Sequence, residues 1–193
     1  SLHTLFKYRT KCYQKNSKTY INISLHNFCV SQHLICTVFF KNDAYYSQFK
    51  CILNENNGPP PEVNLINEKN NGLTLLNLIE KNFIKSAHDV SLGGIITAIS
   101  KMCIKGNKGI QIKKPKFLIN EIEYFFAEDQ GRYLIEINPK DLKEVSKILD
   151  KNSVHYDEIG KIIDKEMIID QKTKLTIDEL KSYNTNWLKS YMI

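Results

Sequence analysis

The sequence lacks several features that would place it in a specialised class of protein. No apolar run approaches the roughly 20 residues that a membrane-spanning helix needs, so we expect no membrane insertion. No run of five or more like charges occurs, so the net charge of +6 is only a weak argument for nucleic acid. Clustered Lys and Arg with interleaved aromatic residues are also absent, and we expect no nucleic-acid partner. Lys7, Arg9 and Lys11 are followed by no clear apolar core, which is not the pattern of a signal peptide.

Paired cysteine motifs are absent too. The cysteines number five, which is odd, and none is separated from another by two residues. They are Cys12, Cys29, Cys36, Cys51 and Cys103. This usage is typical of reduced thiols in a cytoplasmic protein, and it argues against a disulfide framework or a zinc site.

The residues that are present favour a folded chain with a boundary near residue 58. An apolar content of 42% is enough for a core. Residues 1–24 are polar and basic, as in a fragment edge or a loose arm, whereas residues 27–40 and 45–53 favour strands. Residues 54–61 end in Gly-Pro-Pro-Pro, which fits neither a helix interior nor a central strand. We therefore expect one piece over 1–57 and a domain over 58–193.

After the boundary, helical and strand patterns alternate. The spacing of apolar residues predicts helices over 72–82, 95–106 and 117–126, one from Pro139 with Asn138 as N-cap, and one that Asp178 caps. Strands are expected over 84–90, 108–113, 132–137, 156–163, 166–169 and 174–177. The alternation lacks the regularity of a doubly wound sheet, so we predict an α+β fold with helices packed on a mixed β-sheet.

The first polar motif is Ser-Ala-His-Asp-Val-Ser-Leu-Gly-Gly at residues 86–94. It joins a short strand to an apolar helix, and the pair Gly93-Gly94 would let a ligand approach the backbone closely. The free N–H groups of a helix start suit an anion such as phosphate, and Asp89 stands just before them. The alternative is an ordinary strand-to-helix turn in which Asp89 or Ser91 caps the helix.

The second polar motif is Glu-Asp-Gln-Gly-Arg at residues 128–132. Its carboxylates could hold Mg²⁺, and Arg132 could bind a phosphate in a bidentate manner. The alternative is a solvated turn in which Arg132 pairs with Glu128 or Asp129. The functional interpretation requires this turn to lie beside Gly93-Gly94.

Together these motifs resemble a known family. Residues 86–94, the helix after them and Phe-Phe-Ala-Glu-Asp-Gln-Gly-Arg-Tyr at 125–133 look like the C-terminal domain of phosphoribosylformylglycinamidine synthases, in the aminoimidazole-ribonucleotide-synthetase-like superfamily. Residues 58–61, 158–162 and 177–188 resemble its linker, a late strand and its last helix. The similarity extends over residues 58–193. Residues 1–57 would then be a partial or degenerate end of the preceding ATP-binding-type domain, in which Ser47 stands where the family has a substrate-contacting serine.

The resemblance implies an ATP-dependent ligase of purine biosynthesis. Such an enzyme phosphorylates the formamide oxygen of formylglycinamide ribonucleotide, and ammonia from a glutaminase subunit or domain then displaces phosphate to give the amidine. ATP and Mg²⁺ are the implied cofactors. Because the family's catalytic half has no counterpart here, we expect no catalytic residue in this chain. We expect a scaffold or nucleotide-phosphate role for Asp89, Gly93, Gly94, Arg132 and Ser47, with Glu128 as a metal ligand.

Two interpretations of this resemblance stay open. The chain is a C-terminal piece that works in the whole synthetase, or it is a stand-alone degenerate relative that serves as a binding or scaffold module. In either case we expect uncovered apolar surface, which would pack against the remainder of the synthetase or another copy of the chain.

Overall fold

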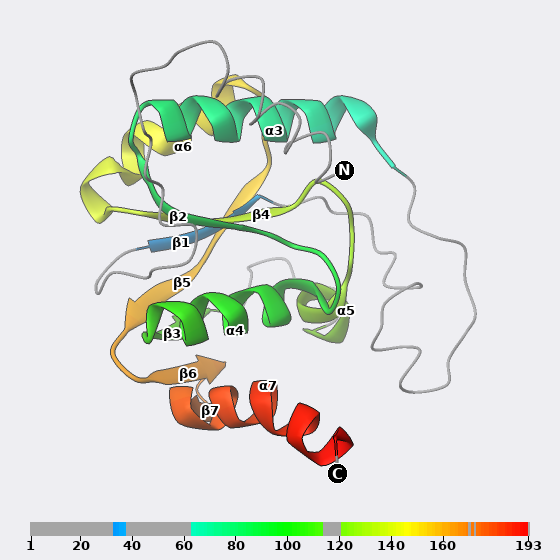
Figure 1. The fold of residues 1–193 in the computed structure, drawn as a ribbon. Coiled ribbons are helices and arrows are strands. Elements are labelled where there is room, and N and C mark those ends of the chain that lie inside the picture. The colour runs from blue at the N-terminus through cyan, green and yellow to red at the C-terminus, as the bar shows by residue number, and fades with distance from the viewer. Residues whose placement is uncertain (1–32, 38–62, 114–120, 170, 172, 193) are drawn as a thin grey trace, which may run out of the picture.

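The computed structural model describes residues 33–37, 63–113, 121–169, 171 and 173–192, with the backbone alone at 33–37, 121–123 and 187–191. Within these residues, seven strands form one sheet in the order β2-β4-β1-β5-β3-β6-β7. Helices cover both of its faces (Figure 1). The architecture is therefore α+β with helices on a mixed sheet, as predicted.

The strands are β1 (His33–Thr37), β2 (Ile84–Asp89), β3 (Gly109–Ile112), β4 (Tyr133–Ile137), β5 (Tyr156–Ile163), β6 (Glu166–Ile169) and β7 (Thr173–Thr176). The helices are α3 (Leu65–Glu80), α4 (Gly94–Gly106), α5 (Glu121–Phe126), α6 (Leu142–Lys151) and α7 (Ile177–Tyr191), with a 3-10 turn, η2 (Pro139–Asp141), before α6. The predicted strands after residue 83 are confirmed, each to within about one residue.

Strand β1 lies inside the sheet, between β4 and β5, and is antiparallel to both. Although β1 precedes the boundary expected near residue 58, its pairing with β4 and β5 places it in the same sheet as the strands after that boundary. Most of residues 1–57 lie outside the described part of the chain, and their assignment to a neighbouring domain stays a prediction. The remaining pairs are antiparallel except β3 with β6, which is parallel.

Two hydrophobic clusters lie on the two faces of the sheet. One packs α4, α5 and the start of α7 against the sheet, and its fully buried members include Ile95, Ile99 and Leu134. The other packs α3 and α6 against the opposite face, through residues such as Leu78 and Ile135. Every residue of β4 is buried because both faces of this strand are covered.

Two predicted helix starts are wrong, each for a local reason. Helix α3 begins at Leu65 rather than at residue 72, because the Asn64 side chain accepts a hydrogen bond from Asn67 N and caps an earlier start. The predicted end of α4 at Gly106 is confirmed, and the next residue, Asn107, is the C-cap in the left-handed conformation. Helix α7 begins at Ile177 instead of being capped by Asp178.

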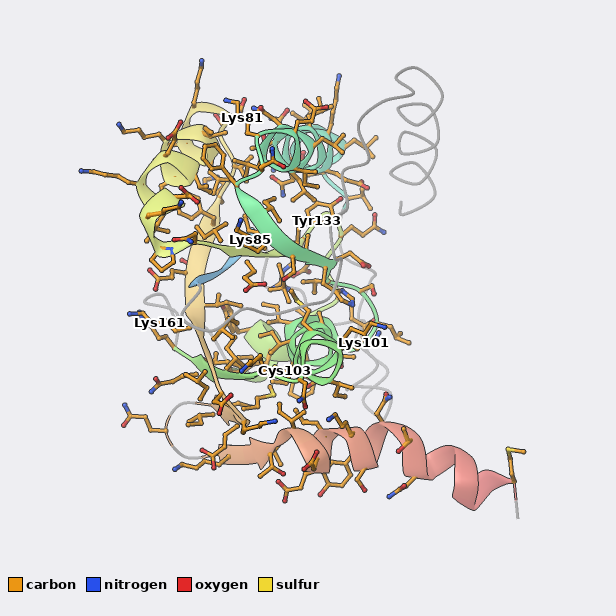
Figure 2. All side chains as sticks on the ribbon, turned by 60° about the vertical axis from the view of Figure 1, so that its left-hand side comes forward. Lys81, Lys85, Lys101, Cys103, Tyr133 and Lys161 are labelled. Carbon is orange, nitrogen blue, oxygen red and sulfur yellow. The ribbon has the colours of Figure 1, made fainter. Side chains whose placement is uncertain are left out.

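A reciprocal capping box explains the start of α7. Glu179 N donates to Thr176 Oγ1, while Thr176 N donates to Glu179 Oε2. The hydrogen bonds that Thr176 N and Thr176 Oγ1 donate to Glu179 Oε2 lower the pKa of the Glu179 carboxyl. The far end of α7 extends past the body of the sheet (Figure 2), and residues 182–186 are all exposed.

Exposed lysines are spread over the molecule. Lys81, Lys85, Lys101 and Lys161 come from the end of α3, β2, α4 and β5 and point away from one another (Figure 2). Among the residues that the structure describes, no helix combines the length and the apolar character that crossing a bilayer would require.

Candidate phosphate-binding site at the start of helix α4

The first motif forms the connection from β2 to α4. Gly93 and Gly94 both have positive φ angles, +82° and +69°, which L side chains rarely adopt. Gly94 N donates to Ser91 O, and Gly93 is the N-cap but offers no side-chain acceptor. Capping of α4 by Asp89 or Ser91, one of the two alternatives from the sequence, is therefore wrong.

The acceptor for the start of α4 comes from the second motif. Glu128 Oε1 accepts a hydrogen bond from Gly93 N at 2.9 Å across 35 residues of sequence. Helix α4 has no acidic residue in its own first turn, so this carboxylate supplies the negative charge that the helix N-terminus favours. The two motifs thus lie side by side, as the functional interpretation of the sequence requires.

The glycine pair also serves packing inside the protein. A Cβ on Gly94 would lie 2.5 Å from Phe125 O and 2.7 Å from two backbone atoms of Phe126. A Cβ on Gly93 would lie 2.2 Å from Thr97 Oγ1. The close backbone approach expected for a ligand is therefore made, at Gly94, by helix α5.

Arg132 is a buried side chain, with 3% of its surface exposed. Its Nη1 donates to Ala127 O and to Asp129 Oδ2, both at 3.2 Å. The pairing of Arg132 with Asp129, which the sequence offered as an alternative, is therefore present. The pair is buried rather than solvated, because Asp129 is only 8% exposed, whereas Gln130 of the same turn is exposed. Arg132 Nε has no hydrogen-bond partner among the described residues.

Helix α3 contacts the same turn from the other face of the sheet. Asn71 Nδ2 donates to Gly131 O at 2.9 Å, and Asn71 is 2% exposed. A Cβ on Gly131 would lie 3.3 Å from atoms of Glu68. Neither Asn71 nor Glu68 was predicted from the sequence, where the only available signal was a polar residue in line with the buried positions Leu75 and Leu78.

Asp89 lies at the end of β2, opposite Tyr133 of β4. Burial, then the negative charges of Glu68 and Asp89, raise the pKa of Tyr133 to about 12. His88 Nδ1 lies 2.6 Å from Asp89 O, a contact that requires the proton on Nδ1. His88 has 11% of its side chain exposed, whereas Asp89 has 28% and is the more accessible of the two.

The structure therefore brings together five of the six predicted site residues, which are Asp89, Gly93, Gly94, Glu128 and Arg132. Ser47 lies outside the described residues. Within the described part of the chain, no group of three or more His, Cys, Asp and Glu side chains has a geometry that suits a metal. A Mg²⁺ held by Glu128 would need its remaining oxygen ligands from a nucleotide or from water. The start of α4 suits phosphate by its dipole, although Gly93 N already has an acceptor.

Comparison with known families agrees with this fold. The family model for the AIR synthase related protein, C-terminal domain, matches residues 44–171. The chain belongs to this family.

Related proteins of the family are much longer than this chain. Over 141 residues the chain is 65% identical to the phosphoribosylformylglycinamidine synthase subunit PurL of Pelagibacter ubique. These matched residues make up 73% of this chain and 19% of that protein. The PurL subunit of Bartonella henselae is 36% identical over the same share of each chain. The chain thus spans about a fifth of the length of the curated relatives it matches.

Solved structures of the family share the fold. Thermotoga maritima PurL complexed with FGAR has a TM-score of 0.66 at 16% identity, over 83% of this chain and 29% of that one. The same PurL complexed with ATP has a TM-score of 0.63 at 17% identity, over 82% and 27%. At these identities the likeness concerns the fold of the AIR synthase related C-terminal domain.

Proposed function

We propose that this chain is the C-terminal part of the ligase that converts formylglycinamide ribonucleotide, ATP and ammonia to formylglycinamidine ribonucleotide in the cytoplasm. In this proposal a glutaminase subunit or domain supplies the ammonia. The piece serves as a scaffold and binds nucleotide phosphate rather than making or breaking bonds. Its 65% identity to a PurL subunit supports the assignment to this ligase.

The observation that carries the phosphate role is the hydrogen bond from Gly93 N to Glu128 Oε1. It unites the two motifs that were expected to hold nucleotide, although 35 residues separate them. In the proposal, the nucleotide phosphate lies at the Gly93-Gly94 turn on the Gly93 side, because α5 covers Gly94. Glu128 holds its Mg²⁺, and Asp89 contacts the Mg-nucleotide beside them. The Mg²⁺ of the nucleotide would offset the negative charges of the carboxylate and the phosphate. Arg132 would act indirectly, by stabilising the 128–132 turn.

A thermal-shift titration with Mg-ATP and Mg-ADP tests this role, with salt-matched, Mg²⁺-only and Mg²⁺-free nucleotide controls. A ligand at about 100 times its dissociation constant adds roughly 2.7 kcal/mol to the free energy of unfolding, which is a measurable shift in Tm. Asp89→Asn should abolish the shift while keeping the side-chain shape. Asp178→Asn is the matched control, because Asp178 has 95% of its side chain exposed on α7. No saturable shift in the unmodified chain at millimolar Mg-nucleotide would refute the phosphate role.

A second candidate function is a non-catalytic scaffold, and one observation favours it. The hydrogen-bonding groups of the second motif are engaged inside the protein, with Glu128 on Gly93 N and Arg132 on Ala127 O and Asp129. A scaffold needs these contacts and no ligand. In the titration above, a scaffold would show the same Tm with and without nucleotide.

The proposed partner is the remainder of the synthetase, and it would pack on helix α3. Seven large apolar residues are exposed in the described part of the chain, and four of them lie on α3 or just before it: Val63, Leu65, Ile66 and Leu73. The inner face of α3 packs on the sheet, so this helix is apolar on two sides. Such a helix is typical of one that is covered on both sides in the complete protein. The matched 141 residues are only 19% of the Pelagibacter ubique subunit, so a whole synthetase offers further residues to cover it.

Surface labelling would test this partner. Carbene labelling of Leu65, Ile66 and Leu73 should fall when the remainder of the Pelagibacter ubique subunit is added to this chain. Labelling that instead falls as the chain alone is concentrated would favour another copy as the partner. Unchanged labelling in both experiments would refute a docking role for this face.

A further inference from the structure

The inner face of α3 carries a polar residue where an apolar one would be expected. The residues buried on this face are Asn71, Thr74, Leu75 and Leu78, at the spacing of one helical stripe. Leu75 and Leu78 belong to the hydrophobic cluster between α3 and the sheet. Asn71 lies one turn earlier and is 2% exposed, so its amide must find a partner inside the protein.

That partner is the backbone of the second motif. Asn71 Nδ2 donates to Gly131 O at 2.9 Å, across 60 residues of sequence. Gly131 has a φ of +71°, and Glu68 lies so close that a Cβ on Gly131 would be 3.3 Å from two of its atoms. The hydrogen bond fixes the carbonyl of Gly131, and with it the plane of the peptide that leads to Arg132.

The turn is thereby held from both sides of the sheet. At its beginning, Glu128 contacts the start of α4. At its end, Asn71 of α3 holds Gly131, and Arg132 O accepts a hydrogen bond from Val90 N of the first motif. In Figure 1 this segment runs from α5, on the α4 side, to β4, below α3.

We infer that Asn71 is a positioning residue for the phosphate site: it fixes the end of the 128–132 turn and so sets where Glu128 and Arg132 lie relative to the start of α4. This inference rests on the function proposed above. It assigns a role at the site to a residue of α3, which contributes to neither motif. A helix whose outer face is a proposed partner surface therefore contacts the site through its inner face.

The test compares Asn71→Leu with Thr74→Val. Each change removes one buried polar group from the same helix and keeps the number and branching of the side-chain heavy atoms. Thr74 is 4% exposed and lies one turn from Asn71, which makes it the matched control for loss of stability. Two readouts are needed: hydrogen exchange of the backbone amides of residues 128–132, and the affinity for Mg-ATP at a temperature at which both variants are folded.

We expect Asn71→Leu to speed exchange in residues 128–132 and to weaken Mg-ATP binding, each by roughly tenfold or more, because the partly buried carbonyl of Gly131 loses its donor. Thr74→Val should change neither the exchange at 128–132 nor the affinity for Mg-ATP, even if it lowers the Tm as much as Asn71→Leu does. Unchanged exchange at 128–132 in Asn71→Leu, or an equal increase in Thr74→Val, would overturn the inference. If the wild-type chain binds no Mg-ATP, the proposed function is refuted instead. The exchange comparison alone then decides whether Asn71 positions the turn.

Discussion

Gly94 offers the sharpest test of how the two motifs fit together. Its φ of +69° disfavours any L side chain, and a Cβ there would lie 2.5 Å from Phe125 O and 2.7 Å from the backbone of Phe126. The atoms in the way are backbone atoms of α5, which no change of rotamer can move. Gly94→Ala must therefore either strain the β2–α4 turn or push α5 away from α4.

The size of the effect follows from two costs. The left-handed conformation costs a non-glycine residue about 1–2 kcal/mol, and inserting a methyl group into a packed site costs about 1–3 kcal/mol. Their sum is about 2–5 kcal/mol of unfolding free energy. With a urea m-value of about 2–3 kcal/mol/M, the midpoint of urea unfolding should fall by about 1–2 M.

Gly72→Ala is the matched control, because the same substitution should raise the free energy of unfolding there instead of lowering it. Gly72 lies inside α3, and a Cβ on it would have nothing within 4 Å. Alanine at this helical position should stabilise the protein by about 0.5–1 kcal/mol. A Gly94→Ala protein with an unchanged urea midpoint would refute the packing of the glycine pair against α5, and a destabilising Gly72→Ala would refute the open surface around α3.

Three further predictions concern buried or capping groups. Arg132→Met should lower the unfolding free energy by about 3–5 kcal/mol because it leaves buried Asp129 without its cation, and adding Asp129→Asn should recover part of the loss in the same urea assay. Burial raises the pKa of the Cys103 thiol to about 12, so Cys103 should resist iodoacetamide in the folded protein. Because this pKa lies above the ordinary value of 9.0, stability should fall as the pH rises from about 9 toward 12, and Cys103→Ala should flatten that part of the pH profile. Thr176→Ala should speed amide exchange in the first turn of α7 and leave β4 unaffected, whereas equal exchange in both proteins would contradict the capping box with Glu179.

Much of the fold could be predicted because local patterns and packing agree. Strand β4 was recognised from its apolar run, and α4 from apolar residues at helical spacing, and both are buried as that pattern requires. Helix ends were harder, because they depend on single capping contacts. Asn64 extends α3 and Thr176 starts α7, and neither contact follows from hydrophobic periodicity.

The site was harder to predict than the fold, because its contacts join distant segments. The sequence identified both motifs, but it could not show that Glu128 reaches Gly93 N or that Arg132 is buried. It also missed Asn71, whose partner lies 60 residues away. A polar residue on an apolar helical stripe is a signal only when the opposing surface is known.

The contact between Glu128 and Gly93 makes the two expected ligands, Mg²⁺ and the nucleotide phosphate, depend on each other. A carboxylate at the start of α4 repels an incoming phosphate, by about 4 kcal/mol for unit charges about 4 Å apart near a protein surface. A Mg²⁺ ion between the carboxylate and the phosphate reverses the sign of that interaction, since both groups then face a cation. Glu128 as a metal ligand and Gly93-Gly94 as a phosphate turn are therefore one hypothesis rather than two. It requires nucleotide without Mg²⁺ to bind much more weakly than Mg-nucleotide, and it makes the Mg²⁺-free control the arm of the titration that separates a nucleotide site from a simply well-capped helix.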